Sequence, residues 1–430
     1  MRSSIWSAIL MAGSAVAQGD IVSLLKSQPD LSTLLELAAL VDGLPELLSS
    51  SSNITIFAPT NEAFAKVPRD VPEGEAIEYK NNTIAIGALL ANHVFKGTYP
   101  AAAASDTPIF VQSLLDNTYI DFRQPFSNFT GGQYNGVVKS GADVCVLSGE
   151  FGISKVIQAD IKLGPGITIH KVDEIISFGA PLQLFSARAG YTNFNAALGA
   201  AKLGIDFGLT GDDVSLLNIS DFTVFVPTND AFTRIGSVLK TAEVATLQDV
   251  LRYHFVPNAV LFSTSLGNTT VKTLQGNELT ISVFPDGSAF VNSAKIAFTN
   301  NILWNGVAHV IDNVIAPGAF DRKTLNPSAP PESRLAFPSA TPVSQLPFSS
   351  VSFAGDMTYT ATPTLLQTLA AVPTAPAAPS ASASASATKS GGAAPSASTS
   401  SVPVAAGAEV VASRALMGVA VVLGVFGIAL

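Results

Sequence analysis

The residues of this sequence best suited to chemistry are its four histidines, which occupy matching places in two halves of the chain. His93 and His254 lie on apolar stripes typical of helices, and His170 and His309 lie in strand-like runs. A metal site needs three or four converging donors, and the sequence has no HxH, HExxH or CxxC spacing. We therefore expect buried structural histidines; a two-histidine site formed by His93 and His170 is the alternative.

Other catalytic patterns point the same way. The sequence has no GxSxG motif, and its serines concentrate near the C-terminal end. Asp173 and Asp312 each follow a strand histidine by three positions, where we expect them to cap turns or accept backbone amides. The lone cysteine, Cys145, reads as a buried thiol, with pairing to another molecule as the alternative. The sequence thus predicts a protein that is not an enzyme and that holds no metal or cofactor.

The elements that carry these histidines are duplicated. The segment FAPTNEAF at 57–64 recurs as FVPTNDAF at 225–232. Each copy follows a β-branched run, so we predict a strand that ends at Pro59 or Pro227, with Thr60 or Thr228 as the N-cap of a helix. Downstream, a helical stripe at 86–94 matches one at 247–255, and GITIHKVDEII at 166–176 matches GVAHVIDNVI at 306–315.

This FxPTNxAF box, followed by a histidine about 30 residues later and a closing NGVxHVIDxVI strand, resembles the fasciclin domain. The resemblance implies an α+β fold with two tandem domains, at 18–180 and 181–320, each a small β-wedge or sandwich with packed helices. The first copy departs from the pattern because Asn92 stands where the second copy has Tyr253. Its longer spacings predict surface insertions at about residues 68–82 and 99–136.

The two ends of the chain read as processing signals. Residues 1–17 have the features of a secretory signal peptide. Residues 405–430 combine small residues, a short polar spacer and an uncharged apolar tail, which predicts a GPI anchor attached at Ala405; Ser398 to Ser401 are the fallback, and a single membrane span is the alternative. Between the domains and this signal, residues 321–404 are rich in Ser, Ala, Thr and Pro, which predicts a disordered stalk.

Charge and glycosylation motifs limit the partners. The 430 residues carry a net charge of −9 and no basic run, so nucleic acid and anionic lipid headgroups are poor partners. In a secreted chain, N-x-S/T sequons are candidate N-glycan sites. The sequons outside the stalk are at Asn53, Asn81, Asn128, Asn218 and Asn268.

The fasciclin resemblance implies an extracellular protein that mediates adhesion or organises a cell wall or matrix. In animal members of the family a Tyr-His pair and an Asp-Ile pair have been proposed as integrin contacts. The matching residues here are Tyr253, His254, His93, Asp160 and Ile161, with Asn301 and Ile302 as the second copy's version of the last pair. The expected partners are cell-surface or matrix proteins, or a wall polysaccharide, with a lipid anchor holding the chain to a membrane.

Two other functions remain open. A glycan-binding module would need an exposed aromatic platform, for which the first-copy insertion offers Tyr119, Phe122, Phe126, Phe129 and Tyr134. The bland interpretation of these five is a hydrophobic cluster that pins a long loop. A structural spacer, in which the glycans and the stalk matter more than any site, is the third reading.

Overall fold

The computed structural model describes residues 21–44, 48, 51–69, 72–120, 126–163, 166–206 and 217–348. The predicted signal peptide, most of the predicted stalk and the GPI signal with Ala405 lie outside these residues. Among the described residues, no helix is both long and apolar enough to cross a membrane.

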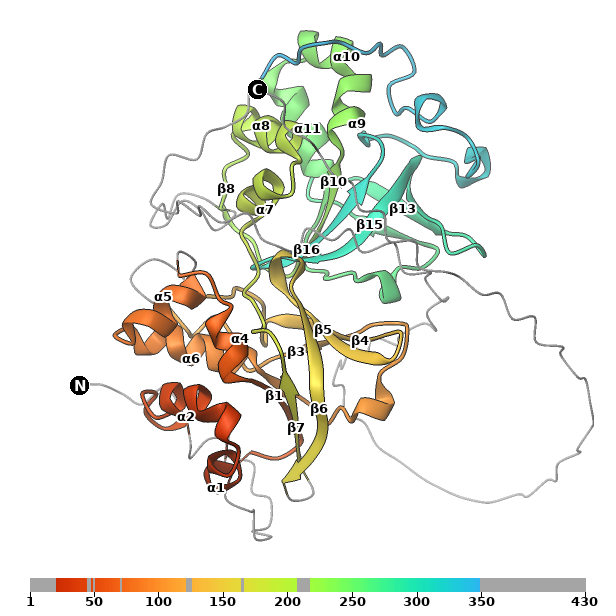
Figure 1. Ribbon diagram of the computed structural model, residues 1–430. Helices are drawn as coiled ribbons and strands as arrows, with labels where there is room; N and C mark the ends of the chain where they lie inside the picture. The colour runs from red at the N-terminus through yellow and green to blue at the C-terminus, as the bar shows by residue number, and fades with distance from the viewer. Residues whose placement is uncertain are drawn as a thin grey trace, which may run out of the picture. The chain divides into compact units, whose positions relative to one another are not determined.

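The first domain combines one sheet with short helices (Figure 1). Its strands are β1 (Ile54–Pro59), β2 (Val94–Lys96), β3 (Ile109–Gln112), β4 (Tyr134–Ser140), β5 (Asp143–Leu147), β6 (Ile153–Leu163) and β7 (Ile167–Val172). Its helices are α1 (Ile21–Lys26), α2 (Ser32–Ala38), α4 (Asn61–Ala65), α5 (Pro72–Tyr79) and α6 (Thr83–Asn92), with 3-10 turns η1 (Pro29–Leu31), η2 (Ala101–Ala103) and η3 (Gly149–Phe151).

The second domain repeats this plan. Its main strands are β10 (Phe222–Pro227), β11 (Phe255–Val256), β12 (Thr269–Lys272), β13 (Glu278–Val283), β14 (Ala289–Val291), β15 (Ala294–Ile302) and β16 (Gly306–Ile311). Its helices are α7 (Leu182–Arg188), α8 (Thr192–Ala201), α9 (Asn229–Arg234), α10 (Gly236–Thr241) and α11 (Val244–Tyr253). A separate parallel pair, β8 (Ile205–Asp206) with β9 (Leu217–Asn218), and turns η4 (Ser263–Ser265), η5 (Arg322–Thr324) and η6 (Pro331–Ser333) complete it.

The two sheets have the same strand order. The first runs β2-β1-β7-β6-β5-β4-β3, and the second runs β11-β10-β16-β15-β14-β13-β12. In each sheet the strand before the PTN box pairs in parallel with the closing strand, β1 with β7 and β10 with β16, while the other pairs are antiparallel. The duplication read from the sequence is therefore a duplication of a complete α+β fold.

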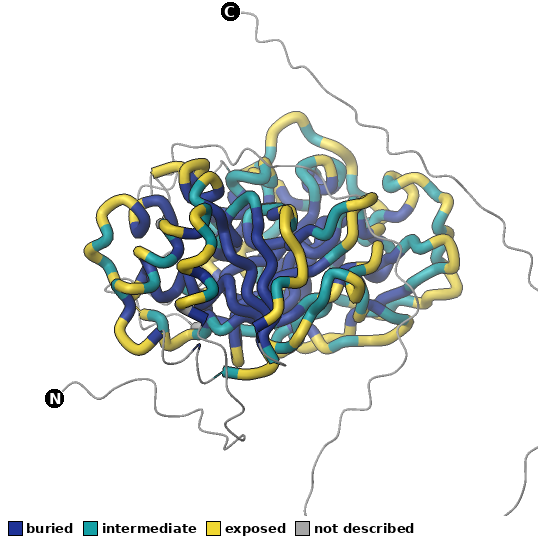
Figure 2. Tube along the Cα trace, turned by 60° about the horizontal axis from the view of Figure 1, so that its bottom comes forward, coloured by how far each residue is buried: buried dark blue, intermediate teal, exposed yellow. Residues whose placement is uncertain are grey.

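Local chemistry sets the start of the helix after the PTN box. The side chains of Thr60 and Thr228 accept hydrogen bonds from the backbone N–H groups of Ala63 and Ala231, both at 3.2 Å, so both predicted N-caps are confirmed. The two central strands β1 and β10 are buried along their whole length, as the dark-blue centre of Figure 2 shows. Strands buried on both faces read as continuous apolar runs, which is the pattern of these two segments.

One predicted boundary is wrong. The sequence reading began a disordered stalk at residue 321, but residues 321–348 are described and their apolar side chains pack against the core of the second domain. These side chains are few and irregularly spaced in a proline- and serine-rich background, so they form no helical or strand period that a sequence reading would detect.

Candidate functional site

The first histidine pair lies at matching helix ends. His93 is the C-cap of α6 and His254 the C-cap of α11, and both rings are buried. Nδ1 of each ring lies on the carbonyl oxygen four residues earlier, at 2.8 and 2.7 Å. Nε2 accepts a backbone N–H from the chain after the closing strand, that of Ile176 at 2.9 Å and that of Ile315 at 3.3 Å. Each ring thus ties the helix end to the closing segment.

The second pair lies on the closing strands and is equally enclosed. Nε2 of His170 lies 2.8 Å from the carbonyl oxygen of Tyr99, and Nδ1 accepts the N–H of Asp160 at 3.2 Å. His309 repeats both contacts on the carbonyl of Leu261 and the N–H of Asn300, at 2.6 and 3.4 Å. Each ring also stacks on the phenylalanine that opens its PTN box.

These contacts explain why all four rings are held neutral. Each ring has one nitrogen facing a carbonyl, which needs a donor, and the other facing an N–H, which needs an acceptor. A second proton would leave that N–H facing another donor, in a site without water. Burial accordingly lowers the pKa of His93, His254 and His309 to about 4, and it also lowers the pKa of His170. The rings act as hydrogen-bonding struts.

The histidines do not form a metal site among the described residues. No group of three or more histidine, cysteine, aspartate or glutamate side chains there is arranged to hold an ion. Both ring nitrogens of His93 and of His170 are already engaged with backbone groups. The two-histidine alternative is therefore wrong for this fold.

The Tyr-His motif lies in the interior. Tyr253 is buried, donates its hydroxyl to the carbonyl of Glu278 at 2.6 Å and accepts from the Asn292 side chain at 2.9 Å. Asn92, in the same place in the first domain, donates to the carbonyls of residues 176 and 177 and accepts from Ser113 and Asn135. Tyr253, His254 and His93 therefore offer no surface for a partner in the folded state, and the polar network around Asn92 was not predicted from sequence.

The Asp-Ile motif is nearer the surface. Asp160 has a positive φ of 59°, lies beside a register shift in the pairing of β6 with β7, and keeps 39% of its side chain exposed. Its Oδ1 accepts the N–H of Ala101 at the start of η2, at 3.2 Å. Ile161 is half-buried and packs against the first core. Asp160 is thus the most accessible residue of the predicted contacts.

The second copy's version of this motif was misaligned by one residue. Asn300, not Asn301, has the positive φ of 64° and receives the histidine ring as Asp160 does. Its side chain accepts the N–H of Ser263 at the start of η4, at 2.7 Å, which repeats the contact of Asp160 with η2. Asn301 and Ile302 are buried. The bulge decides the alignment, because an extra residue in one strand shifts the sequence count without moving the structural position.

The aromatic residues of the first-copy insertion do not form an exposed platform. Phe129 is fully buried, and Tyr134 packs against it edge to face at 5.2 Å between ring centroids. Tyr119 and Phe126 pack against the first core. Phe122 lies outside the described residues. The four described rings fit the bland interpretation, a hydrophobic cluster that pins the loop, and burial raises the pKa of the Tyr119 hydroxyl beyond its usual range.

Comparison with known proteins agrees with this architecture. A family model described as "Fasciclin domain" matches residues 29–178 and 189–317, which together make up more than half of the chain. The chain belongs to the fasciclin family. The match stops at residue 317, so the packed segment 321–348 lies beyond the region that the family model describes.

Several curated fasciclin proteins are similar to this chain. A "Fasciclin-like arabinogalactan protein" of Arthroderma benhamiae is 27% identical over 71% of this chain and 69% of its own length. A protein with the same descriptive name from Cercospora beticola is 28% identical over 64% and 70%. Human periostin is 25% identical over 64% of this chain but only 29% of its own length. The two fungal proteins therefore match over most of their length, as a tandem fasciclin protein would.

The sequons differ in their access to solvent within these fasciclin domains. Asn53, Asn81 and Asn268 are exposed, whereas Asn128 has only 9% of its surface exposed. The exposure of Asn218 lies outside what the structure describes. A bulky glycan at Asn128 would have to displace the packed chain around it.

We expect glycan occupancy to follow this exposure. In the secreted protein, Asn81→Gln should remove the mass of one N-glycan, while Asn128→Gln should leave the glycan mass unchanged. Glycopeptide mass spectrometry before and after enzymatic deglycosylation measures both. A fully occupied Asn128 in correctly folded protein would contradict the packing around this residue.

Proposed function

We propose that this chain is a non-enzymatic extracellular surface protein that mediates adhesion or organises a wall or matrix through its tandem fasciclin domains. The observation that carries the proposal is the engagement of all four histidines as buried struts, which leaves the described part of the chain without a metal group or a histidine free for proton transfer. The similarity to fungal fasciclin-like arabinogalactan proteins and to periostin supports the same class.

The rest of the proposal concerns how the chain reaches and holds its partner. A signal peptide at 1–17 and a GPI signal at 405–430 would place both domains outside the cell, above a Ser-, Ala- and Pro-rich stalk. Two domains on one chain can each make a weak contact, and linkage raises the combined affinity. The partner would be a surface or matrix protein, with wall polysaccharide as the second candidate.

We test the proposal by measuring binding of the secreted chain 18–348 to cells, isolated wall polysaccharides and protein-coated surfaces. Saturable binding to cells or protein is expected. Asp160→Asn keeps an acceptor for the Ala101 N–H but removes the exposed charge, and should weaken that binding about tenfold, as expected for one lost charged contact. Asn300→Asp at the matching place in the second domain is the control for altered local structure.

The possible outcomes separate the three functions. Equal binding by wild type and Asp160→Asn would remove this residue as a contact while leaving the adhesion proposal in place. Retention on one polysaccharide alone would favour a glycan-binding module. Absence of binding to every surface would overturn the proposal in favour of a spacer, a result that exchange of both domains for unrelated ones would then confirm.

A further inference from the structure

The segment beyond the family match, residues 329–348, which we call the strap, lies on the second domain as an extended chain. Its apolar side chains pack against the core formed by the helices and β10; they are Leu335, Phe337, Ala340, Leu346 and Phe348. The aromatic contact is edge to face, between Phe348 and Phe232 of α9, at 6.2 Å between ring centroids. The strap therefore covers apolar surface that the fasciclin fold of this domain would otherwise expose.

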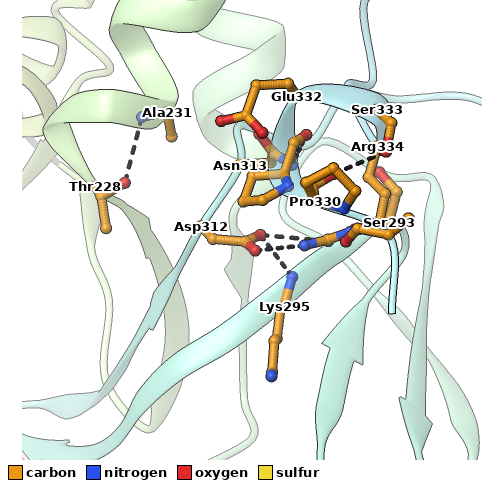
Figure 3. Close-up of polar contacts among 12 residues, drawn as sticks. Thr228, Ala231, Ser293, Lys295, Asp312, Asn313, Pro330, Glu332, Ser333 and Arg334 are labelled. Carbon is orange, nitrogen blue, oxygen red and sulfur yellow. Dashed lines mark hydrogen bonds and ion pairs between the residues drawn. The ribbon is translucent and has the colours of Figure 1, made fainter. Parts of the chain in front are cut away.

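The anchor of the strap is one buried arginine. Only 7% of Arg334 is exposed, and its Nη2 donates to Oδ2 of Asp312 at 2.6 Å (Figure 3). Its Nη1 donates to the carbonyl of Ser293, and its Nε donates back to Ala329 at 2.9 Å. The guanidinium carbon lies 5.3 Å from the ring centroid of Phe290. A planar, five-donor cation on a carboxylate and an aromatic face is a specific recognition geometry.

Further polar contacts fix the register of the strap. The Asn313 side chain donates to the carbonyl of Pro331 at 2.9 Å, and Arg234 reaches Glu332 at 3.2 Å. Farther along, Ser237 exchanges two hydrogen bonds with Thr341, at 3.1 and 2.8 Å. The strap is therefore held at both ends by polar groups of the domain as well as by apolar packing.

Gly236 makes room for the strap. A Cβ atom added at this position would lie 2.0 Å from Cγ2 of Val343, which is closer than any real contact. Val343 in turn donates its N–H to the carbonyl of Thr233 at 3.3 Å. Because valine is stiff at χ1, it cannot easily turn away. The absence of a side chain at Gly236, inside α10, has its physical reason in the strap.

The first domain has part of this site without a cover at the same positions. Lys66 donates to the Asp173 carbonyl as Arg234 does to that of Asp312, and Asp173 accepts the Lys155 N–H as Asp312 accepts that of Lys295. Its counterparts of Thr233, Arg234 and Gly236 are exposed; they are Ala65, Lys66 and Pro68. The duplicated fold therefore stands without a strap there, so the strap is an addition to the fasciclin fold.

The connection to the strap is largely exposed and makes local contacts. Residues 321–324 form the η5 turn, capped by Asp321 on the Lys323 N–H, and Asn326 accepts the N–H of Ser328. Residues 321–324, 326 and 328 are exposed. A segment with such contacts can open without disturbing the core.

We propose that the second domain carries a docking surface for an extended, proline-containing segment with one arginine, and that the strap occupies it as an intramolecular ligand. The docking surface consists of Phe232, Gly236, Ser237, Phe290, Asp312 and Asn313. Recognition comes from the Arg334 ion pair and the seat of Val343 beside Gly236. The downstream chain is thereby attached to this domain through a contact that can release while the domain stays folded.

The test cuts the connection after folding. A site-specific protease sequence is inserted after Asn326 in the full chain, the folded protein is cleaved, and retention of the downstream fragment is followed by size-exclusion chromatography. The wild-type fragment should be retained and should be displaced by a synthetic peptide of residues 329–348. Arg334→Ala should speed fragment loss about 100-fold, because a buried charged hydrogen-bonding group is removed.

Gly236→Ala gives the sharpest discrimination. Alanine favours a helix over glycine, so this change should stabilise α10 itself while expelling Val343. Rapid fragment loss in Gly236→Ala, with retention restored in Gly236→Ala/Val343→Ala, would support docking. Lys66→Ala in the first domain is the matched control and should not change retention.

Two results would overturn the proposal. One is loss of the wild-type fragment at once on cleavage, at the same rate as in Arg334→Ala. The other is a fragment that the peptide never displaces and that leaves only when the second domain unfolds, which would make the strap an integral part of the domain. Dimers that form through the strap before cleavage would show the same docking surface occupied by a second copy.

Discussion

Replacing His254 by alanine is expected to lower the free energy of unfolding of the second domain by about 4 kcal/mol. The ring is buried and bridges the Val250 carbonyl and the Ile315 N–H. Alanine would leave both backbone groups without a partner in the interior and open a cavity beside them. Denaturant unfolding followed by tryptophan fluorescence measures the change, because Trp304 lies in this domain.

The matched control is His93→Ala, which should give a similar loss confined to the first domain, because its ring makes the same two contacts. The pair of variants also separates structure from adhesion. If His254 acted as a direct contact, its replacement would weaken partner binding at unchanged stability. That result would contradict the role as a strut and return the Tyr-His motif to the list of contact residues.

Mild acid is expected to destabilise the second domain more than the first. His254 and His309 have a pKa of about 4 in the folded state, against 6.5 for a free histidine. Between these values the unfolded chain binds more protons, so stability is fully present above pH 6.5 and is lost as the pH falls toward 4. Each ring withdraws about 3 kcal/mol across this window.

The first domain has a group that works in the opposite direction. Burial raises the pKa of Glu73 to about 7, although its Oε1 accepts the Phe178 N–H at 2.8 Å. Between pH 4.5 and 7 the folded state holds the extra proton there, so this contribution to stability grows as the pH falls. It offsets much of the loss from His93, while the second domain has no comparably buried acid among its described groups with a raised pKa.

Denaturant unfolding at pH 7, 5.5 and 4.5, with hydrogen exchange resolved by domain, measures this difference. The amides of β10 and β16 should lose protection before those of β1 and β7. Glu73→Gln should make the stability of the first domain fall more steeply with acid, because the compensating proton uptake is gone. Equal acid sensitivity of the two domains in wild type and variant would contradict the assignment.

The fold was largely predictable because the duplicated signals are local. The PTN box, with Thr60 and Thr228 as N-caps and the apolar strands before it, specifies a strand-to-helix turn from nearest neighbours alone. The structural role of the histidines was predicted from the apolar stripes around them, and the structure names the backbone groups that they bind. The predicted contact residues were less successful, since Tyr253, His254 and His93 are buried.

Two features required the tertiary structure, and both depend on contacts distant in sequence. The match of Asp160 to Asn300 follows from the bulge that each histidine braces, because one extra strand residue shifts the count. The strap followed from the carboxylate of Asp312 and the empty space at Gly236, which become a seat for Arg334 and Val343 only when strand, helix and tail meet. The sequence by itself determined the duplication, the α+β class and the helix starts, because these depend on period and capping; the docking of an aperiodic tail depends on shape and charge that only the folded domain presents.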